Sequence, residues 1–342
     1  MTITQPDYFD SFSCIAGDCP DSCCIGWQVI PDREHLNFYS TLEGSLGEEI
    51  RNGIVDIDGE PSFALCDGRC CMLREDGLCK IQYALGEEAL SQICGFYPRF
   101  ETELGLIREQ GLSISCPEVA RMILTRKTPI VLKTYQTDDP LRFYHDVEPE
   151  RIMAVRQGRD NALKLLQDQT LSLSDKMKEL LFIALEVDES ELEEPLSDAP
   201  DTKMTHEAFL SFRTGLYHLF RSMEHLRPRW PGLLDSCFRG AALTALKEDT
   251  CWDRLLSYYL FKYALRSAMD DNFLQWVSIG ILSVVFLQDL LSQGAGDLID
   301  LVQLYAKETE HNEDNIDLLM NALWDDPMFS PESIIMLLNY FS

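Results

Sequence analysis

Cysteines dominate the chemistry that the first third of the sequence offers. Ten of the twelve cysteines lie before residue 117, and the stretch CIAGDCPDSCC places four of them within eleven residues. In chain order the ten are Cys14, Cys19, Cys23, Cys24, Cys66, Cys70, Cys71, Cys79, Cys94 and Cys116. Thiols at this density form disulfides, bind structural zinc or hold an iron–sulfur cluster.

Disulfides are the weakest of these three readings. The first residues, MTITQPDYFDSFSC, lack the basic and apolar regions of a signal peptide, so we expect a cytoplasmic protein whose thiols remain reduced. A chain of 342 residues with 46% hydrophobic residues also builds its own core without cross-links.

Zinc and an iron–sulfur cluster both remain open on spacing alone. Structural zinc favours two paired knuckles, and Cys19/Cys23 and Cys66/Cys70 each have that spacing. The later cysteines, Cys79, Cys94 and Cys116, come singly, which suits a cubane cluster because each of its irons takes a separate thiolate. We therefore favour a 4Fe–4S cluster and keep zinc as the alternative.

The cysteine motifs also carry a family resemblance. The segments are YFDSFSCIAGDCPDSCCIGWQV, GRCCMLREDGLCKIQYALGEEALSQICGFYPRF and SISCPEVAR. In this order they resemble the flagellin lysine-N-methylase family and, more distantly, small proteins described as zinc- or iron-chelating. The resemblance covers about the first 120 residues specifically and the remainder more loosely.

The resemblance implies a cytoplasmic enzyme that methylates lysine side chains of flagellin with S-adenosylmethionine and carries a 4Fe–4S cluster. Carried over by position, it gives two candidate ligand sets. The first choice is Cys70, Cys79, Cys94 and Cys116, and the second set is Cys14, Cys19, Cys23 and Cys24. Cys66 and Cys71 are extra thiols beside Cys70, so the ligand set and the number of centres stay open.

Lysine methylation needs a neutral amine, although a free lysine has a pKa of about 10.4. Tyr97 and Glu118 lie near the cysteine motifs, but each also has an ordinary structural role available, and we assign no catalytic base. The aromatic run Tyr258, Tyr259, Phe261 and Tyr263 either lines a pocket for a lysine chain or packs helices together. No Gly-x-Gly-x-x-Gly turn marks a site for S-adenosylmethionine.

The net charge of the chain limits the classes of macromolecule that it can bind. Asp and Glu number 57 against 29 Lys and Arg, a formal net charge of −28, which repels nucleic acids and anionic membranes and attracts a lysine-bearing protein. The longest uncharged run, 272–287, is shorter than the roughly 20 residues of a membrane span. We read it as a buried helix and expect no membrane insertion.

The pattern of breakers and periodic apolar residues divides the chain in two. We predict a cysteine-rich metal-binding domain over 1–135, with short helices over 32–42 and 86–94 and a third entered at Ser115–Glu118. We predict a helical domain over 136–342, with capping residues at Ser172 and Ser330. Its helices are expected over 150–166, from 172, over 205–223, 252–269, 273–290, 298–306 and 316–323, and from 330, with a solvated loop over 186–201.

The fold class is therefore mainly α, with an irregular cysteine-rich N-terminal part packed on an all-helical C-terminal part. The function favoured by the sequence is protein-lysine N-methylation. The rivals are a non-enzymatic metal-binding adaptor and a redox protein. Binding of S-adenosylmethionine distinguishes the enzyme from the adaptor, and reversible reduction without methyl transfer marks the redox protein.

Overall fold

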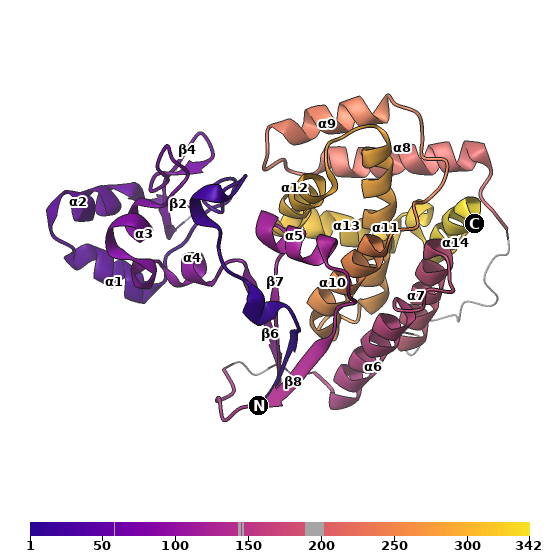
Figure 1. Ribbon diagram of the computed structural model, residues 1–342, viewed down its shortest axis with the longest axis horizontal. Helices are drawn as coiled ribbons and strands as arrows, with labels where there is room; N and C mark the ends of the chain where they lie inside the picture. Colours follow the sequence, from indigo (N-terminus) through magenta and orange to yellow (C-terminus); the bar gives the residue numbers. More distant parts are fainter. Residues whose placement is uncertain (58, 143–144, 146, 189–201) are drawn as a thin grey trace.

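The computed structural model describes residues 1–57, 59–142, 145, 147–188 and 202–342. Fourteen α-helices lie within these residues, together with short strands near the N-terminus, so the prediction of a mainly α protein is confirmed. The helices of the first hundred residues form a small lobe beside the large helical body (Figure 1).

The small lobe contains the first four helices and two small sheets. Its elements are α1 (Arg33–Thr41), α2 (Gly44–Gly53), β2 (Ile54–Ile57), β3 (Glu60–Phe63), β4 (Leu65–Cys66), β5 (Arg69–Cys70), α3 (Lys80–Leu85), the 3-10 turn η3 (Glu87–Ala89) and α4 (Gln92–Phe96). Its core is separate from that of the helical body and centres on Tyr39, Ile50 and Phe63. The buried Tyr39 hydroxyl donates to the Ala89 carbonyl at 2.8 Å, which ties α1 to the segment before α4.

A four-stranded mixed sheet connects the small lobe to the helical body. Its strands are β1 (Thr2–Pro6), β6 (Arg99–Leu104), β7 (Ile107–Leu112) and β8 (Leu132–Gln136), in the order β6-β7-β1-β8. β1 runs parallel to β7 and antiparallel to β8, while β6 and β7 form a hairpin. The sequence analysis predicted no strands, because the pairing of β1 with segments a hundred residues away leaves little local signal.

The helical body contains ten helices within the described residues. They are α5 (Pro117–Thr125), α6 (Pro149–Leu165), α7 (Leu173–Asp188), α8 (His206–Ser222), α9 (Arg229–Phe238), α10 (Thr250–Ser267), α11 (Phe273–Ser292), α12 (Leu298–Glu310), α13 (Glu313–Asp325) and α14 (Pro331–Phe341). Three further 3-10 turns are η1 (Phe9–Ser11), η2 (Ala16–Asp18) and η5 (Pro327–Phe329). Most of the predicted helices agree with these bounds to within a few residues at each end.

Helix starts follow the capping signals in the sequence. Ser172 and Asp175 bond reciprocally at the start of α7, where the Asp175 amide donates to the Ser172 hydroxyl at 3.1 Å and that hydroxyl donates to the Asp175 carboxylate at 2.7 Å. Ser330 caps α14 through the Ser333 amide at 3.3 Å. Pro117 occupies the first turn of α5, as predicted.

Helix α11 forms the centre of the large core. It is long and apolar enough to cross a membrane, but 94% of its apolar window is buried inside the protein. On this helix Phe286 stacks on Phe220 of α8 with ring centroids 4.2 Å apart. The prediction of a buried helix here is confirmed, and the apolar run is accounted for by packing.

Several elements differ from the prediction. Helices α2, α3 and α9 were not predicted, and the helix predicted over 86–94 is replaced by η3 and the short α4. Gly86 has a φ of +88°, and Ser91 is extended, so the chain turns at both places instead of continuing as one helix. Most of the loop predicted over 186–201 lies outside the described residues.

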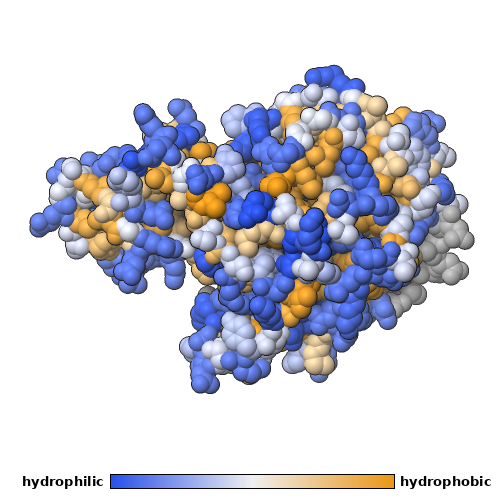
Figure 2. Space-filling model, viewed as in Figure 1, coloured by the Kyte–Doolittle hydropathy of each residue, from blue (hydrophilic) through white to orange (hydrophobic). Residues whose placement is uncertain are grey.

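The surface agrees with the acidic composition. Hydrophilic side chains cover most of the face shown in Figure 2, with apolar residues in small separate groups. The small lobe exposes several large apolar side chains: Ile30, Phe38, Val55, Leu65, Tyr83, Leu85, Ile93 and Phe96. Such scattered exposure is ordinary for a folded protein.

Candidate functional site

Backbone hydrogen bonds bring three cysteine-bearing segments together in the small lobe. The Cys70 amide donates to the Cys24 carbonyl at 2.8 Å, and Ile25 forms a bridge with Arg69. Leu73, three residues after Cys70, forms a second bridge with Cys79. Cys24 and Cys70, which are more than forty residues apart in the sequence, are thus held side by side, and Cys79 joins the same segment through Leu73.

The thiols of two pairs of adjacent cysteines interact and shift each other's pKa in opposite directions. A hydrogen bond between the thiols lowers the pKa of Cys23 to about 7 and raises the pKa of Cys24 well above its ordinary value. Cys70 and Cys71 repeat the arrangement, with the pKa of Cys71 lowered to about 7 by the hydrogen bond with Cys70. Cys71 also donates to the Gly53 carbonyl at 3.5 Å, so this extra thiol is engaged with the end of α2.

The pKa values of the remaining lobe cysteines, Cys79 and Cys94, depend partly on the charges of these pairs. Burial raises the pKa of Cys79, and the charges of Cys23 and Cys71 raise it further. Burial raises the pKa of Cys94 to about 11, with smaller effects from Cys79 and Cys23. We call Cys24, Cys70, Cys79 and Cys94 the lobe thiols; Cys70 lies in the core of the lobe and the other three pack against it.

Cys116 belongs to a different neighbourhood. Burial raises its pKa to about 11, and the cysteines whose charges add to this effect are Cys19 and Cys14. Burial also raises the pKa of Cys19, which responds to both Cys14 and Cys23. Cys70, Cys79 and Cys94 of the first predicted ligand set therefore lie together in the lobe, whereas its fourth member, Cys116, lies in the core of the helical body.

The chemistry of these donors fits a thiolate-held cluster. All twelve cysteines are free, and the lobe thiols come from four separate segments, as a cubane tolerates. Within the part of the chain that the structure describes, no three His, Cys, Asp or Glu side chains are arranged to hold a single metal ion. The raised pKa values keep most lobe thiols protonated in this arrangement, so metal binding would release protons.

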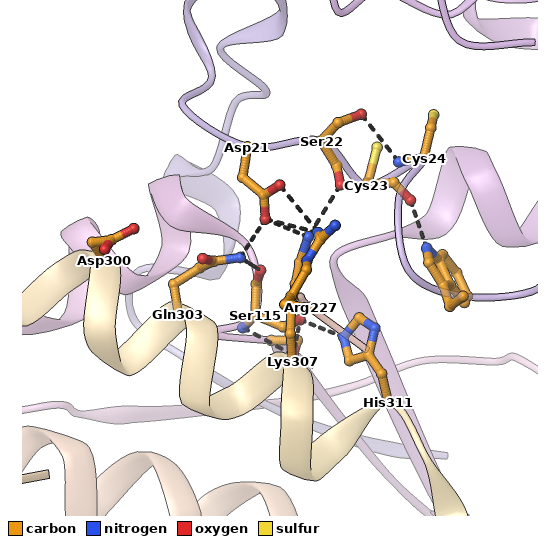
Figure 3. A network of polar contacts seen from close by, with 12 residues as sticks. Asp21, Ser22, Cys23, Cys24, Ser115, Arg227, Asp300, Gln303, Lys307 and His311 are labelled. Carbon is orange, nitrogen blue, oxygen red and sulfur yellow. Dashed lines mark hydrogen bonds and ion pairs between the residues drawn. The ribbon is translucent and has the colours of Figure 1, made fainter. Parts of the chain in front are cut away.

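One carboxylate joins the cysteine loop to the helical body. Asp21 accepts from Arg227 at 3.0 and 3.1 Å, from Gln303 at 2.8 Å and from Lys307 at 2.6 Å (Figure 3). Lys307 also donates to the Ser22 carbonyl at 3.1 Å. These contacts, which we call the Asp21 clasp, place the loop that carries Cys23 against α12.

Charge balance within the clasp is tight. Burial by itself would raise the pKa of Asp21, but the ammonium of Lys307 and the guanidinium of Arg227 outweigh it and hold that pKa below its ordinary value. Burial lowers the pKa of Lys307, and Asp21 opposes this effect. Two buried cations therefore share one anion.

Three aromatic rings lie next to the clasp. The Trp27 centroid is 5.9 Å from that of Tyr97 and 5.6 Å from that of His311, and the Tyr97 and His311 centroids are 6.0 Å apart. The Trp27 indole donates to the Cys23 carbonyl at 2.5 Å. Burial lowers the pKa of His311 to about 3, with contributions from nearby Lys and Arg charges, so its imidazole is neutral.

A chain of hydroxyl groups leads from these rings to a buried carboxylate. Ser115 is 2.7 Å from the His311 ring nitrogen, 3.1 Å from the Tyr97 hydroxyl and 2.8 Å from the Ser113 hydroxyl. Ser113 in turn donates to Glu310 at 3.4 Å. Backbone and side chain at residues 113–115 therefore link the cysteine motif SISCPEVAR to the end of α12.

The residues that the sequence analysis named as candidates for handling the substrate lysine lie in different environments. Tyr97 hydrogen-bonds Ser115, which also bonds His311; we call these three residues, at the seam between the lobe and the helical body, the seam network. Glu118 instead pairs with Arg121 on α5 at 2.6 Å. The aromatic run on α10 is buried in the core, but two of its members, Tyr258 and Tyr263, surround the ammonium of Lys262. The burial of all four residues agrees with the helix-packing interpretation of that run.

Sequence reasoning missed Asp21 and its partners. Gln303, Lys307 and His311 are spaced by four residues, so Gln303 and Lys307 share one face of α12 and His311 continues it at the C-cap. The predicted helix ended at 306 and left two of the three outside it. The four-residue spacing of these polar side chains predicts a shared polar face. The spacing does not predict which loop that face contacts.

The fold and the site define a mainly helical protein that combines a thiol-rich lobe with a helical body. Residues 159–337 match the family model described as FliB lysine N-methylase C-terminal domain. Because this match covers more than half of the chain, the chain belongs to the FliB lysine N-methylase family, a family of protein-lysine methyltransferases. The resemblance found in the sequence is confirmed.

Individual relatives agree with this assignment. The flagellar biosynthetic protein FliU of Salmonella muenchen is 30% identical over 154 residues, which are 42% of this chain and 91% of that protein. The lysine-N-methylases of Salmonella typhimurium and Salmonella choleraesuis are each 31% identical over 131 residues, or 36% of this chain. The matched region spans 33% of the length of those two relatives. No solved structure matches the chain.

Removing the charge of Asp21 tests the clasp. We expect Asp21→Asn to lower the free energy of unfolding by about 3 kcal/mol, because Lys307 and Arg227 lose the anion that compensates their burial. Denaturant titration of the purified protein measures this change. Asp18→Asn, an exposed acid in the same loop, is the matched control, and equal effects of the two substitutions would contradict the assignment.

Glu308 should make stability depend on pH. It is fully buried, and burial raises its pKa from 4.5 to about 7, against backbone amides and Arg227 that lower it. Its contribution is fully present below pH 4.5 and is lost as pH rises to about 7, a change of about 3 kcal/mol. Relative to wild type, Glu308→Gln should therefore gain stability over this range, as measured by denaturant titration at several pH values. The exposed Glu313→Gln should show no such trend.

Proposed function

We propose that this protein transfers methyl groups from S-adenosylmethionine to lysine side chains of flagellin. The observation that carries the proposal is the family match over 159–337, together with relatives named as lysine-N-methylases. The name of the FliU relative, a flagellar biosynthetic protein, supports a flagellar substrate. A net charge of −28 favours approach of a lysine-bearing protein. Reduced thiols suit the cytoplasm.

The lobe thiols would hold the proposed 4Fe–4S cluster. Relative to the first ligand set predicted from the sequence, Cys24 replaces Cys116, because Cys24 shares a backbone hydrogen bond with Cys70 and responds to the charges of Cys70 and Cys79. Cys116 lies in the core of the helical body instead of that of the lobe. When bound, the cluster would cross-link four segments that little secondary structure connects, and zinc is the alternative occupant.

The seam between lobe and body is the proposed reaction region. An amine must lose its proton before it accepts a methyl group, and the new N–C bond forms as the sulfonium S–C bond breaks. Tyr97 and His311 are neutral groups that each hydrogen-bond the Ser115 hydroxyl there, and Glu310 is linked to Ser115 through Ser113. Such groups orient a neutral amine without adding a competing positive charge.

Metal analysis tests the cluster. Protein purified without oxygen should contain about four irons and four acid-labile sulfides per chain. Serine substitution of any lobe thiol should reduce iron content by more than half, whereas Cys66→Ser, at an exposed thiol, should leave it unchanged. Stoichiometric zinc without sulfide would assign the site to zinc, and full iron content in Cys24→Ser with loss in Cys116→Ser would restore the original set.

A methylation assay tests the activity. Flagellin incubated with the protein and S-adenosylmethionine should gain mass in steps of one methyl group at lysine residues, as read by peptide mass spectrometry. Flagellin whose lysines have been chemically acetylated should gain none. Binding of S-adenosylmethionine without methyl transfer to flagellin would leave the family assignment intact and exclude flagellin as the substrate.

A further inference from the structure

The ammonium group of Lys262 is enclosed by aromatic rings and a carboxylate. Its Nζ atom lies 5.3 Å from the ring centroid of Phe100, 5.6 Å from that of Tyr258 and 5.3 Å from that of Tyr263. It also forms an ion pair with Glu310 and donates to the Tyr258 hydroxyl at 3.1 Å. Three rings and one anion around an ammonium make a cation-binding cage.

The fold builds this cage from three elements far apart in sequence. Tyr258 lies one helical turn before Lys262 on α10, while Glu310 ends α12. Phe100 comes from β6 opposite Gly111 of β7, where a side-chain Cβ would lie 2.2 Å from the Phe100 ring. Glycine at position 111 therefore leaves room for this wall of the cage.

Stacking on Trp276 holds Tyr263, another wall of the cage, in place. Tyr263 lies parallel to Trp276 of α11, with ring centroids 3.8 Å apart. Tyr258 and Tyr263 are buried, and Phe100 is half-buried. The side chain of Lys262 keeps 14% of its surface exposed, so the cage is not fully closed to solvent.

Glu310 has unused binding capacity. Its side chain is 3% exposed. One carboxylate oxygen accepts from Tyr258 at 2.9 Å, from Ser113 at 3.4 Å and from Lys262. The other oxygen is buried and has no hydrogen-bond partner among the described residues. A buried carboxylate oxygen without a donor is costly, and an incoming ammonium supplies donors.

We propose that this cage receives the lysine ε-ammonium of the protein substrate and that Lys262 occupies it when substrate is absent. The proposal rests on the proposed function. Cation–π attraction and the carboxylate select a primary alkylammonium, and a methylated amine keeps the charge that the rings attract. The chain from Glu310 through Ser113 and Ser115 places the cage behind the seam network.

Small-ligand binding tests the cage without enzymatic activity. Isothermal titration with butylammonium chloride should show Lys262→Ala binding about tenfold tighter than wild type, because the cage is vacated. Lys262→Met fills the same space without charge and should bind no better than wild type. Equal binding by Lys262→Ala and wild type would overturn the proposal, provided that thermal unfolding shows both are folded.

Kinetics test the link to the substrate. If flagellin is methylated, Lys262→Ala should lower its KM several-fold, and adding Glu310→Gln should abolish that gain. Lys164→Met, at an exposed lysine of α6, should leave KM unchanged. An unchanged or raised KM in Lys262→Ala would show that Lys262 is only a structural ion pair. If no variant methylates flagellin, the proposed function fails, and the butylammonium titration still decides whether the cage binds ammonium.

Discussion

The shared burial of Asp21, Lys307 and Arg227 is the constraint on which the site depends. A buried cation needs an anion, and the clasp supplies one anion to two cations from different parts of the helical body. The anion comes from the loop that also carries Cys19 and Cys23. The electrostatic requirement of the body therefore determines where the cysteine loop lies.

Other buried charges of the body follow the same rule. Arg159 of α6 pairs with Glu109 of β7, and Arg213 of α8 pairs with Asp289 of α11 at 2.9 Å. Such pairs are costly to break because each leaves a charge without compensation, and they fix how elements meet more than they add stability. The cage around Lys262 also contains an ion pair, between Lys262 and Glu310. To this pair the cage adds three aromatic rings and a carboxylate oxygen without a donor among the described residues.

Cys23 links the lobe thiols to the clasp, because its neighbours Asp21 and Ser22 bond to Lys307. The charge of Cys23 raises the pKa values of Cys79 and Cys94 in the lobe and also that of Cys19. Its carbonyl accepts from Trp27, which contacts Tyr97 and His311. A metal centre held by the proposed lobe ligands would lie beside the groups proposed to handle the substrate amine, and its role would then be to position them.

Local sequence determined most of the helices, because their signals are local. Ser172 and Ser330 are capping residues, Pro117 suits a first turn, and the apolar run of α11 has no other stable place than a core. The cysteine motifs identified the family without any structure. Strands β1 and β8 were missed because their pairing joins segments more than a hundred residues apart.

Only the tertiary structure decided which residues meet. The family resemblance grouped Cys116 with Cys70, and the structure places Cys116 in the core of the helical body and Cys70 in the core of the lobe, where a backbone hydrogen bond joins Cys70 to Cys24. The sequence likewise contains Asp21, Lys262 and Glu310 as ordinary charged residues. Their partners lie on other elements, and burial, which makes a charge require a specific partner, exists only once those elements have packed.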